Sequence, residues 1–359
     1  MKVLMLGNHE SVHGGITSVI KQLLNYNWRA DNIQMKFIAT YKYSNNILKI
    51  LYFIWAYFKI LIYIMKEKPD IVHVHMSHSG SFIRVNFIKK MCMRLNTPIV
   101  VHLHGSEFKK FYKNSSSENK KEIIRLFNDI SGTIVLGEQW KKFILDISQD
   151  ANVIVLNNTV KIPELVPRDV DKDIQILFLG VLIERKGVLD ILKSFKKLKD
   201  IGILEKFNVK FNIGGSGIEE VKLKEFVELN EMNDYINFLG WINEEEKKEM
   251  LKRNQLFILP SYNEGLPIAI LEAMSYGLAI VSTDVGSIQE AVHDNINGFI
   301  VTPGNIDGYF EALKELIINK DLRVNMMNQS RKIALEKFDE KNYFERIKIL
   351  YEEIGKKNE

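Results

Sequence analysis

Residues 256–282 read Leu256-Phe-Ile-Leu-Pro-Ser-Tyr-Asn-Glu-Gly-Leu-Pro-Ile-Ala-Ile-Leu-Glu-Ala-Met-Ser-Tyr-Gly-Leu-Ala-Ile-Val-Ser282, and this stretch decides the fold. Four apolar residues come first and stop at Pro260, as in a short buried strand. A turn that contains Gly265 and Pro267 follows, and a helical pattern comes after it. A second apolar run at 279–282 completes a strand–helix–strand unit. Such units predict a parallel β-sheet.

The same alternation of apolar runs and helical patterns fills the rest of the chain. Residues 157–173 contain two prolines and many charges, which is typical of a linker. A chain of 359 residues exceeds what one hydrophobic core usually supports, so we predict two doubly wound α/β domains, 1–160 and 161–340. We expect strands at 3–6, 35–40, 71–75, 99–102, 132–136 and 152–156, then at 174–180, 208–214, 236–239, 256–259, 279–282 and 298–301.

Composition narrows the class of protein. The single cysteine, Cys92, excludes an intramolecular disulfide framework and suits a reducing compartment. The net charge of +4 hides an asymmetry, because residues 1–160 hold 21 basic and 11 acidic side chains while the remainder holds 28 and 34. A basic first half is expected to face an anionic partner, either nucleic acid or an anionic membrane.

Residues 47–65 are apolar and long enough to span a bilayer. Only Lys49 and Lys59 interrupt the run, and both lie in one arc of the helical wheel. A lysine at a helix centre disfavours insertion, and the segment leads directly into the strand expected at 71–75. We therefore predict a deeply packed crossover helix of a soluble domain; the alternative is that part of it touches lipid.

Two carboxylates in the opening stretch suggest a ligand with hydroxyl groups at both ends. Glu264 precedes the expected helix and Glu272 lies within it. If the spacing were helical throughout, about 12 Å would separate them along the axis, similar to the distance between the sugar and the ribose of a nucleotide sugar. Carboxylates bind vicinal hydroxyls well because both oxygens accept hydrogen bonds.

The strings Glu264-Gly-Leu-Pro267 and Leu271-Glu-Ala-Met274 resemble the signature of retaining GT-B glycosyltransferases of the large family four. The resemblance implies two Rossmann-like domains that face each other across a cleft, with the acceptor in the first and the donor in the second. It also implies that a terminal helix at about 341–359 packs back on the first domain. By this resemblance Glu264 holds sugar hydroxyls, Glu272 holds the ribose, and the amides of Gly265 and Leu266 assist near the sugar.

Arg185 and Lys186 follow the strand expected at 174–180 and precede a helix. Backbone amides and the macrodipole favour an anion at a helix entrance, and Arg can grip a phosphate with two parallel hydrogen bonds. The string Phe178-Leu-Gly-Val-Leu-Ile-Glu-Arg-Lys-Gly187 also resembles the corresponding family element. The resemblance implies that these two cations neutralise a departing diphosphate, so that no bound metal or other cofactor is needed.

Other glycines and one tryptophan are candidate donor contacts. Gly14 and Gly15, after His13, let the backbone approach a phosphate closely and match the glycine-rich first loop of the family. Gly215 belongs to a loop that lines the nucleotide pocket in the family. Trp241 ends the next strand and is a candidate contact of the base.

The pairs His73/His75 and His102/His104 each share a strand face, which raises the possibility of zinc. No cysteine or carboxylate nearby in the sequence completes a ligand set, so we predict no metal site. His104 ends its strand at the sheet edge, and it resembles the family histidine beside the reacting sugar. We expect His104 to support catalysis and His102 to be structural.

Aromatic and basic residues alternate around Phe108-Lys-Lys-Phe-Tyr-Lys113 and Trp140-Lys-Lys-Phe143. Lysines beside interfacial aromatics are typical of a peripheral membrane contact, so Lys109, Lys110 and Lys113 are candidates for membrane or acceptor binding. An ordinary solvated surface explains the pattern as well. The sequence contains no nucleic-acid-binding motif, and we expect no such partner.

Together these features predict a retaining glycosyltransferase that uses a nucleoside diphosphate sugar, with UDP-sugar favoured as donor. The expected acceptor is a lipid-linked saccharide of bacterial capsule, exopolysaccharide or O-antigen synthesis, and the expected location is the cytoplasmic face of the inner membrane. One alternative is a transferase with a soluble acceptor such as a sugar phosphate. Another is a catalytically silent subunit that binds nucleotide.

Overall fold

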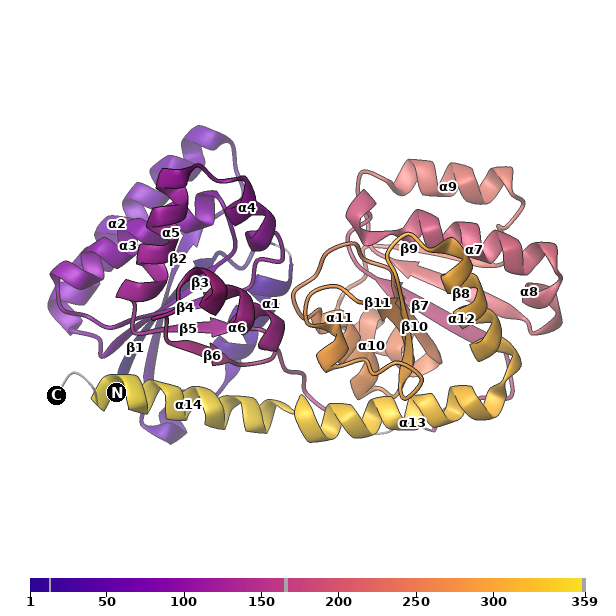
Figure 1. Ribbon diagram of the computed structural model, residues 1–359. Coiled ribbons are helices and arrows are strands. Elements are labelled where there is room, and N and C mark those ends of the chain that lie inside the picture. The colour runs from indigo at the N-terminus through magenta and orange to yellow at the C-terminus, as the bar shows by residue number, and fades with distance from the viewer. Residues whose placement is uncertain (13, 165–166, 357–359) are drawn as a thin grey trace. The chain divides into compact units, whose positions relative to one another are not determined.

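The computed structural model of the protein describes residues 1–12, 14–164 and 167–356. They form two compact units (Figure 1), each with its own parallel sheet. Unit 1 comprises residues 1–158 together with 343–359, and unit 2 comprises residues 159–342.

In the described part of unit 1, six parallel strands have the order β2-β1-β3-β4-β5-β6. Apolar side chains fill these strands, and the central β1 and β3 are buried on both faces, as parallel sheets require. The strands are β1 (Lys2–Asn8), β2 (Gln34–Tyr41), β3 (Ile71–Met76), β4 (Ile99–Leu103), β5 (Gly132–Val135) and β6 (Val153–Val155). The helices are α1 (Gly15–Asn25), α2 (Asn46–Glu67), α3 (Gly80–Arg94), α4 (Phe108–Asn114), α5 (Ser117–Asp129), α6 (Glu138–Ile147) and α14 (Glu340–Lys356), with a 3-10 turn at Trp28–Asp31.

Unit 2 repeats this plan, again with six parallel strands among its described residues, in the order β12-β11-β10-β7-β8-β9. Its strands are β7 (Ile174–Leu179), β8 (Val209–Gly214), β9 (Ile236–Gly240), β10 (Leu256–Leu259), β11 (Ala279–Thr283) and β12 (Gly298–Val301). Its helices are α7 (Val188–Asp200), α8 (Ile203–Lys206), α9 (Glu220–Leu229), α10 (Glu244–Arg253), α11 (Ile268–Ser275), α12 (Ile306–Ile318) and α13 (Lys320–Lys337), with 3-10 turns at Glu184–Lys186 and Ile288–Glu290.

Every strand expected from the sequence is present within two residues of its predicted ends. The doubly wound α/β class is therefore confirmed. Short apolar runs bounded by glycine, proline and charged residues identify fully buried strands well, because runs of about four to eight residues are too short for a typical helix. The linker predicted at 157–173 includes residues 165–166, which lie outside the described residues.

The prediction of a deeply packed helix at 47–65 is wrong. In α2 only Ala56, Ile60 and Ile64 are buried. Of the most apolar 18-residue window of this helix, 17% is buried, and α2 is the one helix of the described chain that is long and apolar enough to cross a membrane. The helix contains many apolar side chains, but most of them do not contribute to the core.

Helix α14 joins unit 1 through its later residues. The Tyr351 hydroxyl lies 2.6 Å from His73 Nδ1 on β3, and Lys348 forms an ion pair of 2.9 Å with Asp31. Phe344 stacks on Tyr26 with ring centroids 3.9 Å apart. The later part of α14 thus packs on the core of the unit that contains the beginning of the chain.

Candidate active site

In unit 2 the strand order reverses between β7 and β10, since β8 and β9 lie on one side of β7 and β11 and β12 lie beyond β10. Ligands of open parallel sheets bind at such a switch point, beyond the carboxyl ends of the strands. The loops that follow β7 and β10 carry Arg185, Lys186 and Glu264. The fold therefore brings these three predicted residues to one edge.

Glu264 is the centre of this edge. The residue is buried, with 8% exposed, and its Oε1 accepts a 2.7 Å hydrogen bond from Ser261 Oγ. The same oxygen lies 2.5 Å from Lys186 Nζ, which is itself largely buried. Removing one member of a buried ion pair leaves an uncompensated charge, so each of the two side chains depends on the other for its place.

Backbone contacts fix the two loops against each other. Arg185 Nη1 donates to Asn263 O at 2.9 Å, and the amide of Tyr262 donates to Arg185 O at 2.8 Å. Gly187 has φ +70°, and a Cβ there would lie 2.3 Å from Pro260 O. Only glycine allows this close approach, which places the first turn of α7 beside the end of β10. The Arg185 side chain remains exposed.

The loop after β11 supports the backbone of Glu264. Ser287 N donates to Gly265 O at 2.7 Å, and a Cβ on Gly286 (φ +60°) would lie 2.1 Å from Glu264 O. Leu266 is buried. Gly265 and Leu266 therefore lie in a fixed turn directly after Glu264, and three loops define the position of its carboxylate.

Glu272 lies inside α11, but Glu264 does not, because the helix begins only at Ile268. The separation of about 12 Å, which assumed helical spacing throughout, therefore has no basis. Glu272 Oε1 accepts a 2.6 Å hydrogen bond from Lys247 Nζ on α10. Burial raises the pKa of Glu272, and the Lys247 ammonium opposes this shift.

The two remaining candidates of unit 2 follow β8 and β9. Gly215 has φ +142° and donates from its amide to Gly240 O at 2.7 Å; a Cβ on Gly215 would lie 1.8 Å from Gly180 O. This loop thus packs directly against the end of β7. Trp241 is 56% exposed, so its indole is accessible to a ligand.

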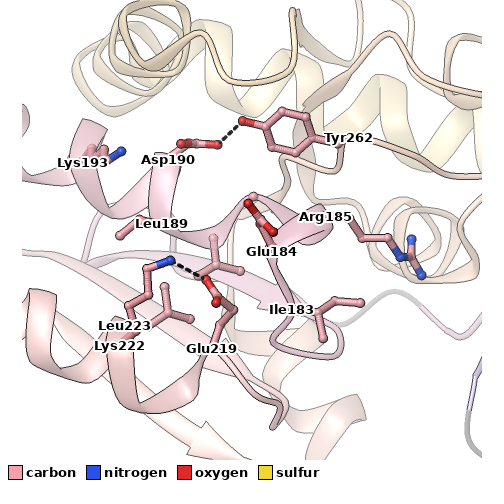
Figure 2. A pocket seen from close by; sticks show the side chains of 12 residues that line it. Ile183, Glu184, Arg185, Leu189, Asp190, Lys193, Glu219, Lys222, Leu223 and Tyr262 are labelled. Carbon is pink, nitrogen blue, oxygen red and sulfur yellow. Dashed lines mark hydrogen bonds and ion pairs between the residues drawn. The ribbon is translucent and has the colours of Figure 1, made fainter.

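A pocket of about 470 Å³ opens beside the first turn of α7. Figure 2 shows the Tyr262 hydroxyl bonded to Asp190 at 2.8 Å and Lys222 paired with Glu219 at 3.0 Å, whereas the Arg185 guanidinium points away from both pairs. The pocket shares Arg185 with the predicted site, but Glu264 and Lys186 are not among its lining residues. We therefore assign the chemistry to the strand edge rather than to this pocket.

Unit 1 has its own switch point, between β1 and β3. Gly14, which precedes α1, has φ +133°, and a Cβ on Gly14 or Gly15 would meet nothing within 4 Å. The amino end of α1 is thus open to an approaching anion. His13, the first residue of this predicted loop, lies outside the described residues.

Four histidines meet on β3 and β4 of unit 1. His75 pairs with His102 in the strand register, and His75 Nδ1 lies 2.8 Å from Nε2 of His104, which directly follows β4. The His102 and His104 rings stack with centroids 4.0 Å apart. Burial lowers the pKa of His73 and of His104 to about 3, and lowers the pKa values of His75 and His102 well below the usual range. The cluster is therefore uncharged at neutral pH.

The ring nitrogens of His73, His75 and His102 lie within 4.8 Å of one another. Sequence reasoning did not foresee that the register would gather three imidazoles. Of the described residues, no cysteine or carboxylate belongs to this group. A divalent cation would bring two charges into a buried site without a counter-charge, which is costly. The structural role predicted for His102 therefore suits its surroundings.

The predicted membrane cluster is packed differently from what its sequence suggests. Phe108 and Trp140 are buried, and Lys109 Nζ lies over the Trp140 ring at 4.9 Å. Phe108 and Trp140 are therefore not interfacial side chains, and a membrane contact through the lysines stays a prediction. Lys110 and Lys113 are exposed, and Lys110 borders a hollow of about 400 Å³ beside the start of α3.

Sequence reasoning missed two residues of the unit 2 site. Ser261 stands in the deciding stretch, three residues before Glu264, but a serine after a strand carries no specific signal. Lys247 lies on α10, 25 residues from Glu272, and only the tertiary fold brings the two together. Such a pair cannot be found from local spacing.

Comparison with known proteins gives a family for each part of the chain. Residues 166–333 match the model of the glycosyl transferases group 1, and residues 30–162 match that of the Glycosyltransferase Family 4. The two matches cover most of units 1 and 2.

The chain is 26% identical over 341 residues to the UDP-Gal:alpha-D-GlcNAc-diphosphoundecaprenol alpha-1,3-galactosyltransferase of Escherichia coli, covering 89% of this chain and 84% of the relative. It is also 26% identical over 263 residues to the amylovoran biosynthesis glycosyltransferase AmsK of Erwinia amylovora, covering 70% of this chain and 62% of that relative. The structure of Anabaena HepE in complex with UDP superposes with a TM-score of 0.76 over 97% of this chain and 98% of that protein, at 16% identity. Both sheets and this likeness confirm the predicted GT-B fold.

Proposed function

Because the chain belongs to the glycosyl transferases of group 1, we propose that it transfers a sugar, with retention of configuration, from a nucleoside diphosphate sugar to a lipid-linked saccharide. The observation that carries the donor half of this proposal is the buried Lys186–Glu264 pair at the switch point of unit 2. A polyanionic donor needs cations there, and a sugar needs hydrogen-bond acceptors.

Arg185 and Lys186 supply the cations. Negative charge grows on the diphosphate as its bond to the sugar breaks, and preorganised positive groups lower the free energy of that state. Arg185 is exposed, and its guanidinium would exchange the hydrogen bond to Asn263 O for one to a phosphate, while Lys186 is held in place by Glu264. These two side chains supply the charge that a metal ion provides in other transferases.

Glu264 supplies the acceptor oxygens for the sugar. Ser261 and Lys186 fix its Oε1, so the carboxylate is oriented before a ligand arrives. The amides of Gly265 and Leu266 follow in the same turn. In the proposed step the departing phosphate oxygen takes the acceptor proton, and the new bond forms on the face that the diphosphate leaves. Positioning and charge stabilisation then account for the rate.

Glu272 binds the ribose in this proposal, with Trp241 and the Gly215 loop near the base. The pairing with Lys247 keeps Glu272 as an acceptor despite its burial. UDP is the favoured nucleotide, since the structurally similar Anabaena protein holds UDP. Unit 1 contributes His104, which is neutral and therefore acts by hydrogen bonding rather than as a cation.

The acceptor is proposed to be a lipid-linked saccharide of bacterial surface polysaccharide synthesis, at the cytoplasmic face of the membrane. Two relatives support this: one is named for a diphosphoundecaprenol substrate and one for amylovoran biosynthesis. The excess of basic residues in 1–160 favours an acceptor or surface that carries negative charge.

A thermal-shift screen with UDP-, GDP- and ADP-sugars tests the donor assignment. A ligand that binds only the folded state raises the melting temperature according to its concentration over its dissociation constant. We expect a UDP-sugar to raise it in the native protein and far less in the Glu272→Gln variant. If no nucleotide sugar stabilises the native protein at millimolar concentration, the proposal is wrong.

A further inference from the structure

Helix α2 is amphipathic with its apolar face outward. Nine large apolar side chains of this helix are between 46% and 72% exposed, among them Ile54, Phe58 and Ile62. At about 100° per residue these nine fall within roughly 160° of the helical wheel, opposite the buried stripe of Ala56, Ile60 and Ile64. A helix at the surface of a soluble domain normally shows polar groups there, so this face indicates a non-aqueous partner.

The helix cannot serve as a span while the sheet is intact. Helix α2 connects β2 to β3, and both of these strands pair with β1 in one sheet. Both ends of α2 are therefore tied to the same sheet. A helix held in this way lies in the plane of a membrane interface rather than across it.

Helix α3, which packs beside α2, adds two exposed apolar side chains to unit 1. Ile83 and Phe87 are 56% and 53% exposed, and the Phe87 ring lies 6.4 Å from that of Phe53 on α2. Figure 1 shows the two helices side by side in unit 1. Lys90 and Arg94 are exposed one and two turns further along α3. The apolar face thus continues into basic residues.

Charge selects between the possible partners. Across α2 and α3 the only acidic residue is Glu67, which pairs with Lys2 at 3.0 Å. Lys59 Nζ lies 4.0 Å from the centroid of the Trp55 ring, a pairing typical of side chains at a headgroup boundary. A second copy of this chain would bring the same positive charges, whereas anionic lipid would neutralise them. The basic residues of the two helices are Lys49, Lys59, Lys66, Arg84, Lys89, Lys90 and Arg94, of which Lys89 is buried and paired with Asp129 at 2.7 Å.

We infer that the outer face of α2, with Ile83 and Phe87 of α3, docks unit 1 onto a bilayer that contains anionic lipid. The nine side chains of α2 enter the acyl boundary, and the exposed lysines and Arg94 bind headgroup phosphates. This inference specifies the surface behind the proposed lipid-linked acceptor. We assign docking to this surface rather than to α4 and α6, where Phe108 and Trp140 are buried.

Vesicle sedimentation with the full-length protein tests the inference. The variant Ile54→Gln/Phe58→Gln/Ile62→Gln changes exposed side chains only, so its melting temperature should stay close to that of the native protein. A control, Ile218→Gln/Val221→Gln/Leu229→Gln, changes three apolar residues of unit 2 that are even more exposed, at 88%, 68% and 83%. We expect the native protein and the control to sediment with phosphatidylglycerol-containing vesicles. The partition coefficient of the α2 variant should be lower by a factor of about ten or more.

Bromine-labelled lipid gives a second readout. Trp55 is 52% exposed on the docking face, and the other exposed tryptophan, Trp241, is removed by Trp241→Phe. Quenching of the remaining emission by brominated vesicles supports docking through α2. The inference is overturned if the α2 variant binds vesicles as well as the native protein does. It is also overturned if the native protein does not bind vesicles, or if it forms a dimer that the α2 variant does not form. No donor or acceptor is present in these assays, so their failure would leave the proposed transfer reaction untouched.

Discussion

The two sheets have the same winding but different chemistry at their edges. In unit 2 the edge holds opposite charges, with Lys186 bound to Glu264. In unit 1 the corresponding edge holds stacked imidazoles that burial keeps neutral. Under the proposed function, the charged edge of unit 2 would bind the anionic donor, while the uncharged edge of unit 1 would not attract phosphate.

The largest effect on activity is expected at Glu264. Glu264→Gln keeps the size of the side chain and a hydrogen-bond acceptor for Ser261, but it removes the charge that pairs with Lys186. Initial-rate kinetics should show kcat/KM about a thousandfold lower, as for loss of a preorganised electrostatic group. Glu219→Gln, which breaks the Lys222 pair in the pocket of Figure 2, is the control and should retain near-native kcat/KM. Equal losses in both variants would contradict the assignment to the strand edge.

Unit 1 should lose stability in acid because of its histidines. The pKa values of His73, His75 and His102 are depressed in the folded protein, so below pH 6.5 the unfolded chain binds protons that the native state does not. Stability is then lost as pH falls, by up to about 1.4 kcal/mol for each ring between pH 7.5 and 5.5.

Urea unfolding at the two pH values measures this loss, and His102→Phe should reduce the pH dependence. His9→Gln, a histidine outside the cluster, serves as the control. A pH dependence that is the same in His102→Phe and native protein would show that the ring does not resist protonation.

A smaller effect, about a hundredfold in kcat/KM, is expected for Arg185→Lys. Lysine keeps the charge but lacks the planar guanidinium group that binds a phosphate through two parallel hydrogen bonds. Lys196→Ala, on the following helix α7 and paired with Asp200, is the control. If Arg185→Lys turns over donor at the native rate, the guanidinium does not bind the diphosphate.

The smallest effect concerns Glu272. Glu272→Gln should weaken UDP binding about tenfold by calorimetry, with kcat nearly unchanged, since one charge-assisted hydrogen bond to a ribose hydroxyl is lost. Lys247 would then lose its partner as well. A large fall in kcat with unchanged UDP affinity would reverse the roles assigned to Glu264 and Glu272.

The sequence predicts the strands and the switch-point residues because these depend on local patterns. Buried parallel strands show as apolar runs, and residues that follow them reach the same edge by topology alone. The side-chain contacts could not be predicted from the sequence. Lys186 and Glu264 are 78 positions apart, and the contacts of His75 depend on strand register.

Burial of apolar helices was also unpredictable. Periodicity shows that α2 has an apolar face, but not which face meets the core. The same limit explains Trp140, which resembles an interfacial residue by its lysine neighbours and is nevertheless buried.

The central claim is that the unit 2 edge catalyses transfer with retention. Proton NMR of the first-formed product, read from the anomeric coupling constant before mutarotation, tests it most directly with the donor selected by the thermal-shift screen. The account predicts the same anomeric configuration in product as in donor. An inverted product would contradict it.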